Sequence, residues 1–293
     1  MGLGEALALA APMAWGLAVV LFRRSGESMP PFELNLCKNA LAGALMLVTV
    51  LAVYGLELPS FTAREYGLMV ASGLLGMAVA DTWYFRALNL LGAGRAGIIG
   101  SLLSPFVILL SALFLGERLT PWQWAGFALV MLGILLVTWR RRRREVSSEE
   151  LRMGVGLGVA AVFLMAVGVV MVKEILETRP FLWVVEWRLL GGVAGMLVVL
   201  TLRRRWGAAL AVYRAPHPWR MTLFASFLGG YLAMILWLGG YRLLPASVAS
   251  IYNEAQASFI VLFAWLILRE PMEGRKLAGL GFTIAGVAVM LLV

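Results

Sequence analysis

Five ionisable side chains lie inside long apolar stretches of the sequence, and they are the residues with which this chain could do chemistry. They are Lys38, Asp81, Glu186, Arg188 and Glu254. A charge well inside a membrane span is costly unless it is paired or faces water, so each is a functional candidate by default. An acid can bind a cationic group or a proton, and a base can bind a carboxylate. These residue types therefore indicate the binding of a small charged solute.

Glu254 lies in the sequence Tyr252-Asn253-Glu254-Ala255-Gln256, near the middle of an apolar segment. On a helix, Tyr252 and Gln256 share one face, and Asn253 and Glu254 flank it. Because so much polarity is hard to turn toward lipid, we expect Glu254 to face a cavity and to bind a cationic group or a proton there. The alternative is a structural contact with another helix.

The other charged candidates are open to two interpretations. Arg188 is a candidate partner for a substrate carboxylate, and Glu186 does not face it because residues two apart on a helix do not meet. For Asp81, a structural salt bridge or cap is as well supported as substrate contact. Lys38 occupies a region corresponding to that of Arg188, but it lies close enough to its helix end to snorkel, which favours a structural role.

Aromatic residues supply flat surfaces for stacking and cation–π contact, although anchoring at the membrane interface is their commoner role. We expect Trp237 and Tyr252 to lie in the cavity, and Tyr84, three residues after Asp81, is a further candidate. Nine residues are thus predicted to line the cavity and bind the substrate: Glu254, Asp81, Arg188, Asn253, Gln256, Tyr252, Trp237, Tyr84 and Lys38.

Composition determines what must position these residues. With 61% hydrophobic residues, 14% charged residues and a mean hydropathy of +0.88, the chain lies well outside soluble globular usage. We expect an all-α integral membrane protein, because Leu and Ala runs with scattered Gly favour helices over barrel strands. Ten apolar segments can be drawn, at about 3–22, 33–54, 66–88, 93–115, 121–139, 153–173, 181–202, 219–241, 246–268 and 275–293.

An internal duplication relates the fourth and fifth apolar segments to the ninth and tenth. At a shift of 153 residues, segment 93–133 aligns on 246–286 without a gap, and 11 of 41 positions are identical. The chain therefore divides into a five-helix repeat at 1–139, a basic linker at 140–152 and a second five-helix repeat at 153–293. Five spans is an odd number, so the second repeat must insert upside down. The prediction is ten transmembrane helices in two inverted repeats around a central cavity.

The distribution of arginine gives the orientation. Arg and Lys concentrate in the odd-numbered connections, so the positive-inside rule places these in the cytoplasm and both termini outside. The net charge of +9 is explained by these loops and by anionic lipid, and nucleic acid is not an expected partner. The first segment has no positive residue before it, which indicates a span and not a cleaved signal peptide.

Catalysis, metals and cofactors are not expected. One cysteine, Cys37, and one histidine, His217, leave no disulfide, no Ser/His catalytic pair and no His/Cys metal site. The alternation Gly154, Gly156 and Gly158 lacks the strand and the following residues that a phosphate-binding loop needs, and it indicates close helix packing. The spacing of Gly126 and Gly133, repeated in the second half, indicates the same.

The segment Gly116-Glu117-Arg118-Leu119-Thr120-Pro121-Trp122-Gln123-Trp124-Ala125-Gly126 resembles the signature of the EamA family of the drug/metabolite transporter superfamily. The second half repeats it more loosely around Glu270 and Gly279. Trp15-Gly16, Arg188 and Ser104-Pro105 are further matches. The chain departs from the family pattern at Ser258, which replaces the proline equivalent to Pro105.

This resemblance implies ten helices in two inverted halves, with YddG-like amino-acid exporters as the nearest functional model. We therefore expect a bacterial inner-membrane carrier that exports amino acids or related amines by alternating access. Glu254 and Asp81 would meet the amino group and Arg188 the carboxylate. Coupling to protons through Glu254 and uncoupled diffusion are both compatible with the sequence. No ATP motif is present.

Two alternatives remain open at this stage. Two intramembrane acids and many aromatic residues would also suit efflux of lipophilic or quaternary organic cations. A membrane scaffold or lipid-handling protein is the alternative from another class. The expected partners are a small-molecule substrate and the lipid bilayer, and because both halves are fused, we expect a monomer.

Overall fold

The computed structural model of the chain describes residues 2–91, 96, 99–138, 147–268, 272 and 274–291, and within these ranges it is helical with no strand. The helices of the first half are α1 (Leu3–Ser25), α2 (Pro31–Tyr54), α3 (Ala63–Gly73), the π-helix η1 (Leu74–Ala80), α4 (Asp81–Leu91), α6 (Leu103–Phe114) and α7 (Pro121–Thr138). The later helices are α8 (Ser148–Val170), α9 (Lys173–Thr178), α10 (Phe181–Leu202), α11 (Trp206–Arg214), α12 (Trp219–Ser226), the π-helix η2 (Phe227–Leu232), α13 (Ala233–Leu243), α14 (Ala246–Asn253), α15 (Gln256–Leu268) and α16 (Gly274–Leu291).

Seven helical stretches among the described residues are long and apolar enough to cross a membrane. The helices α6 and α7 are shorter and also apolar. The all-helical class predicted from composition is confirmed, and the length and hydropathy of these stretches agree with a membrane protein. The count of ten crossings and the inversion of the two halves stay predictions. The seven stretches are Leu3–Phe22, Pro31–Tyr54, Ala63–Leu91, Ser148–Thr178, Phe181–Leu202, Trp219–Leu243 and Gly274–Leu291.

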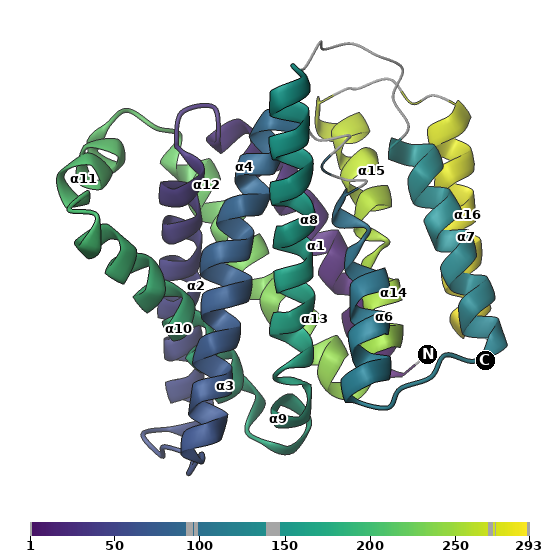
Figure 1. Ribbon diagram of the computed structural model, residues 1–293, viewed down its shortest axis with the longest axis horizontal. Helices are drawn as coiled ribbons and strands as arrows, with labels where there is room; N and C mark the ends of the chain where they lie inside the picture. The colour runs from purple at the N-terminus through teal and green to yellow at the C-terminus, as the bar shows by residue number, and fades with distance from the viewer. Residues whose placement is uncertain are drawn as a thin grey trace.

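The helices run roughly side by side, and their connections gather at two opposite ends (Figure 1). The connection from α1 to α2 and the segment containing α11 lie at one end, together with the start of α8. The start of α1 and the end of α16 lie at the opposite end. The arginine-containing segments 23–30 and 203–218 therefore share one end of the molecule, in agreement with the charge pattern.

Two π-helical segments interrupt equivalent helices of the two halves. The segment η1 begins at Leu74 and η2 begins at Phe227, which is the same shift of 153 residues found in the sequence alignment. A second pair of interruptions follows the same shift, because turns occur at Ser101–Leu102 and at Glu254–Ala255. Short π segments and broken helices are common at functional sites, so these four positions indicate where such a site lies.

The last helices of the two halves, α7 and α16, pack against each other at the edge of the bundle (Figure 1). A Cβ added at Gly133 would lie 2.6 Å from the carbonyl oxygen of Gly279, and one added at Gly286 would lie 2.6 Å from that of Gly126. No side chain fits at these crossing points. The prediction that these glycines permit close packing is confirmed.

The boundaries of the connecting segments differ from those expected. Helix α8 begins at Ser148, within the predicted linker, because the Ser147 side chain accepts a hydrogen bond from the Glu150 amide and Glu150 bonds back to Ser147. The arginine-rich part of the linker, 140–146, lies outside the described residues. The short helices α9 and α11 were not expected from the pattern of apolar segments.

Candidate substrate-binding cavity

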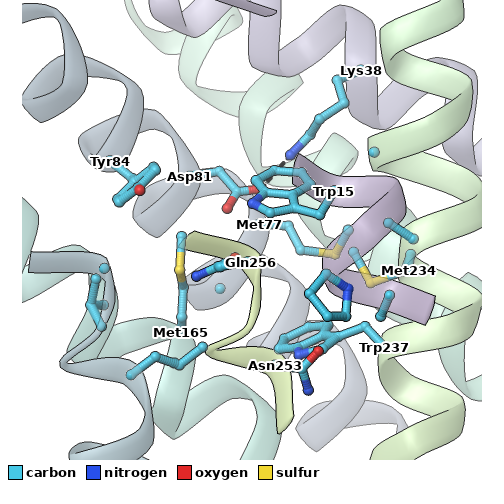
Figure 2. Close-up of a pocket in the computed structure, with 18 of the residues that line it drawn as sticks. Trp15, Lys38, Met77, Asp81, Tyr84, Met165, Met234, Trp237, Asn253 and Gln256 are labelled. Atoms are coloured by element: carbon cyan, nitrogen blue, oxygen red, sulfur yellow. Dashed lines mark hydrogen bonds and ion pairs between the residues drawn. The ribbon is translucent and has the colours of Figure 1, made fainter. Parts of the chain in front are cut away.

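A cavity of about 120 Å³ lies between helices of both halves, with room for several water molecules or part of a small solute. Its walls come from α1, α2, η1 with α4, α6, α8, α10, η2 with α13, and the break between α14 and α15. Figure 2 shows that polar and aromatic side chains from these elements converge on one space. Seven of the nine predicted site residues line it: Lys38, Asp81, Tyr84, Arg188, Trp237, Asn253 and Gln256.

Lys38 and Asp81 form an ion pair on the wall of this cavity. The Lys38 Nζ lies 2.5 Å from Asp81 Oδ2 (Figure 2). It also lies 5.7 Å from the ring centroid of Trp15 and 5.5 Å from that of Phe85. Lys38 is only 1% exposed. The expectation that Lys38 snorkels to its helix end is therefore wrong, because a carboxylate and two aromatic rings provide it with partners in the interior.

Polar side chains of α2 hold the π-helix that directly precedes Asp81. The Asn35 Nδ2 donates to the Met77 carbonyl at 2.8 Å and to Thr82 Oγ1 at 3.1 Å. The Asn39 Nδ2 donates to Asn35 Oδ1 at 3.1 Å and to the same carbonyl at 3.4 Å. Since Met77 belongs to η1, these bonds fix the segment that sets the direction of Asp81.

Arg188 brings a second cation to the cavity, and this one forms no salt bridge within the described part of the chain. The residue is 2% exposed, and its Cζ lies 6.0 Å from the Trp237 ring centroid. In the described part of the chain, its Nε and Nη1 have no hydrogen-bond partner. A Cβ added at Gly73 would overlap the Arg188 carbonyl oxygen, so this glycine permits the close approach of α3 to α10 that places the guanidinium.

Glu254 does not line the cavity. It follows the last residue of α14, is 1% exposed, and accepts hydrogen bonds at Oε1 from the backbone amide and the hydroxyl of Ser104 at 3.2 and 2.9 Å. Its Oε2 has no partner among the described residues. The carboxylate thus stabilises the first turn of α6, whose amides have no partner within their own helix.

Tyr252 does not line the cavity either and packs in an apolar cluster with Val130, Ile134 and Met290. The expected shared face with Gln256 assumed a continuous helix. The turn at Glu254–Ala255 interrupts the helical phase, and only Asn253 and Gln256 are left facing the cavity.

Glu117, in the segment that resembles the family signature, has a structural role at the start of a helix in the other half. Its Oε1 accepts from the Ala246 amide at 2.7 Å, and its Oε2 accepts from the Ser247 amide and hydroxyl at 2.9 and 2.7 Å. It thereby caps the N-terminus of α14 in the other half. The corresponding Glu270 lies outside the described residues.

The sequence interpretation missed the apolar lining of the cavity. Met77, Met165 and Met234 carry no charge and stand among many similar apolar residues, so nothing in the pattern distinguishes them. Trp15 lies beside Lys38 and could have been found from the Trp15-Gly16 match. Within the described ranges, no group of three or more His, Cys, Asp and Glu side chains is placed to hold a metal ion.

Glu186 remains apart from this arrangement. It is 0% exposed, and neither of its carboxylate oxygens has a hydrogen-bond partner among the residues that the structure describes. It is absent from the lining of the cavity. Its position on the same helix as Arg188 therefore does not make the two a pair, as their spacing predicts.

A cavity of this kind, lined by a few buried charges between apolar helices, is typical of membrane transporters. The model of the EamA-like transporter family matches residues 2–139 and again residues 152–292, and the chain belongs to this family. The sequence prediction of the EamA family is thereby confirmed.

Individual relatives cover most of the chain. A probable amino-acid metabolite efflux pump of Escherichia coli is 27% identical over 284 residues, which cover 94% of this chain and 89% of that protein. An uncharacterized transporter of Archaeoglobus fulgidus is 25% identical over 94% of both chains. The pseudopaline exporter CntI of Pseudomonas aeruginosa is 27% identical over 71% of this chain and 72% of its own. A solved crystal structure with a TM-score of 0.77 covers 99% of this chain and 96% of its own at 20% identity, which shows a shared fold.

Proposed function

We propose that this protein is a secondary transporter of the bacterial inner membrane that exports amino acids and related small metabolites by alternating access. The observation that carries this proposal is the cavity itself. Among its apolar and aromatic walls lie the ion pair of Lys38 with Asp81 and the guanidinium of Arg188, whose Nε and Nη1 have no hydrogen-bond partner among the described residues. The relatives named as an amino-acid metabolite efflux pump and a pseudopaline exporter support an exporter of small metabolites.

Alternating access needs two halves that can move against each other. The paired π segments and the paired helix breaks, each at a shift of 153 residues, support two repeats of one architecture. The double family match over residues 2–139 and 152–292 supports the same division. We propose ten crossings in two inverted repeats, with both termini outside and a single chain as the functional unit.

The orientation can be tested by cysteine accessibility. After replacement of the native Cys37 by serine, one new cysteine is placed at Glu57, in the exposed connection after α2, or at Ala215, after α11. A membrane-impermeant maleimide should label Glu57→Cys in intact cells and Ala215→Cys only after permeabilisation. The reverse pattern would overturn the proposed orientation.

The transport activity is tested by uptake of radiolabelled amino acids into proteoliposomes, with and without a proton gradient. We expect uptake by the wild type and loss of uptake in Arg188→Gln. Glu254→Gln, measured beside it, shows whether a proton gradient acts through this carboxylate. Uptake of quaternary cations without uptake of any amino acid would refute the proposal and favour the cation-efflux alternative.

A further inference from the structure

We infer that this cavity recognises the carboxylate of the substrate and not its ammonium group. An apolar carboxylate that lacks a free amino group should therefore bind with an affinity similar to that of the amino acid. The inference rests on the proposed function and narrows the substrate class of the same site. It is carried by the unequal surroundings of the two cations that line the cavity, Lys38 and Arg188.

The charges that line the cavity leave one cation uncompensated. Lys38 and Asp81 cancel each other at a separation of 2.5 Å, and Glu254 lies outside the lining with its Oε1 bonded to Ser104. What remains is the guanidinium of Arg188, which is buried and near the Trp237 ring. A buried charge without a partner is unfavourable, and an anionic ligand removes this cost where a cationic ligand adds to it.

Arg188 has the free donors that a carboxylate needs. Its Nε and Nη1 have no hydrogen-bond partner in the part of the chain that the structure describes, although both atoms are buried. A guanidinium can donate to both oxygens of one carboxylate at once, which gives orientation as well as affinity. The Arg188 guanidinium is thus able to bind a carboxylate, and the close contact of α10 with Gly73 holds it at the cavity wall.

The acid that could bind a substrate ammonium is already occupied. Asp81 accepts its short bond from Lys38, whose Nζ is also placed beside the rings of Trp15 and Phe85. An incoming ammonium group would have to displace this intramolecular partner. The binding of an ammonium group at Asp81 is therefore less favourable in free energy than the binding of a carboxylate at Arg188.

The remaining lining favours an apolar or aromatic body attached to the carboxylate. Aromatic rings offer stacking surfaces, and thioether groups adapt to the shape of a ligand and contact its rings favourably. Figure 2 shows these side chains around the central space, together with the amide groups of Asn253 and Gln256. The aromatic rings and thioethers of this lining belong to Trp15, Tyr84, Trp237, Met77, Met165 and Met234.

The inference can be tested by calorimetric titration of the purified full chain with three ligands that share one ring. L-Phenylalanine has both charged groups, N-acetyl-L-phenylalanine keeps only the carboxylate, and 2-phenylethylamine keeps only the ammonium. We expect dissociation constants of the first two within about threefold of each other, and binding of the amine weaker by about tenfold or more.

Variants assign the effect to one side chain. Arg188→Gln should abolish binding of both carboxylates, and Arg188→Lys, which keeps the charge but not the planar fork, should weaken both by about tenfold. Arg242→Gln is the matched control, since Arg242 also lies over an aromatic ring, Phe181 at 5.7 Å, but does not line the cavity. Its affinities should equal those of the wild type.

The other outcomes show whether the inference fails alone or together with the proposed function. If phenylalanine binds and its N-acetyl derivative binds more than about tenfold less tightly, the amino group is required and the inference fails, while amino-acid export stands. If only the amine binds, both fail. If none of the three binds, the inference fails, and uptake of another amino acid into proteoliposomes would still support the proposed function.

Discussion

The carboxylate of Glu254, in the second half of the chain, accepts hydrogen bonds from the amide and the hydroxyl of Ser104, in the first half. The relationship is reciprocal at the level of the helices. Glu254 follows the last residue of α14 and caps the start of α6, while Glu117, just beyond the end of α6, caps the start of α14. Two antiparallel helices from different halves are thus joined at both ends, and we expect α6 and α14 to move as one unit.

Replacement of Glu254 by glutamine should lower the stability of the protein. The variant keeps an acceptor for Ser104 but loses the negative charge at the N-terminus of α6, and a hydrogen bond to a charged group contributes about 1.5–3 kcal/mol. Ser104→Ala should have a smaller effect because the amide still donates to Glu254. The measurement is the thermal midpoint of the purified protein in detergent.

Glu186→Gln is the control for this experiment, because it removes another buried carboxylate that has no hydrogen-bond partner among the described residues. Its midpoint should equal or exceed that of the wild type. Equal losses in Glu254→Gln and Glu186→Gln would show that the contact with Ser104 contributes nothing specific.

The buried pair of Lys38 and Asp81 should behave as a unit. Removing one partner leaves an uncompensated charge in the interior, which lowers the free energy of unfolding by about 3–5 kcal/mol. Replacing both partners by apolar residues often leaves the stability unchanged. We expect Lys38→Met and Asp81→Leu each to be strongly destabilised and the double variant to recover most of the loss. A double variant whose loss equals the sum of the single losses would argue against the coupling.

The requirement for glycine where α7 crosses α16 can be tested with a control position in the same pair of helices. Gly133→Ala should separate the helices, since its Cβ would lie 2.6 Å from the Gly279 carbonyl oxygen and would overlap the Thr283 hydroxyl. Gly281→Ala meets nothing within 4 Å. Both gain the same helix propensity, about 1 kcal/mol, so the difference between their thermal midpoints isolates the clash. Similar midpoints would show that the pair tolerates a wider spacing.

The sequence predicts the membrane class, the family and most of the residues that line the cavity, because these depend on local sequence patterns and not on how the helices pack. Hydropathy needs no tertiary information, and a buried charge such as Arg188 must find an interior position wherever its helix packs. Trp237, Asn253 and Gln256 follow from the same reasoning about polarity inside apolar segments.

Two expectations were wrong, the snorkelling of Lys38 and the cavity positions of Tyr252 and Glu254, because each assumed an uninterrupted helix or an isolated one. The break at Glu254–Ala255 changes which side chains share a face, and a periodicity of 3.6 residues cannot reveal it. The partner of Lys38 is 43 residues away along the chain, and the hydroxyl that binds Glu254 is 150 residues away. Such pairings are properties of the packed bundle, and a single sequence does not contain them.

His217 should make the contact between α1 and α12 sensitive to mild acid. The residue lies in the connection before α12, where its Nδ1 is 2.8 Å from Ser28 Oγ and its Nε2 is 2.6 Å from Thr222 Oγ1. Thr222 donates its own proton to Ser25, so Nε2 is the protonated nitrogen and Nδ1 accepts from Ser28. Partial burial lowers the pKa of His217 below its usual value, because the charged imidazolium loses contact with water.

A base whose pKa is lowered in the folded state binds protons more readily when the protein unfolds. The stability linked to His217 is therefore fully present above the ordinary pKa of about 6.5, falls as the pH drops through that value, and levels off below the folded pKa. We expect the thermal midpoint of the wild type to fall more between about pH 7.5 and about pH 5.5 than that of His217→Gln, whose amide can donate to Thr222 without titrating. Parallel declines in the two proteins would assign the pH dependence to other groups.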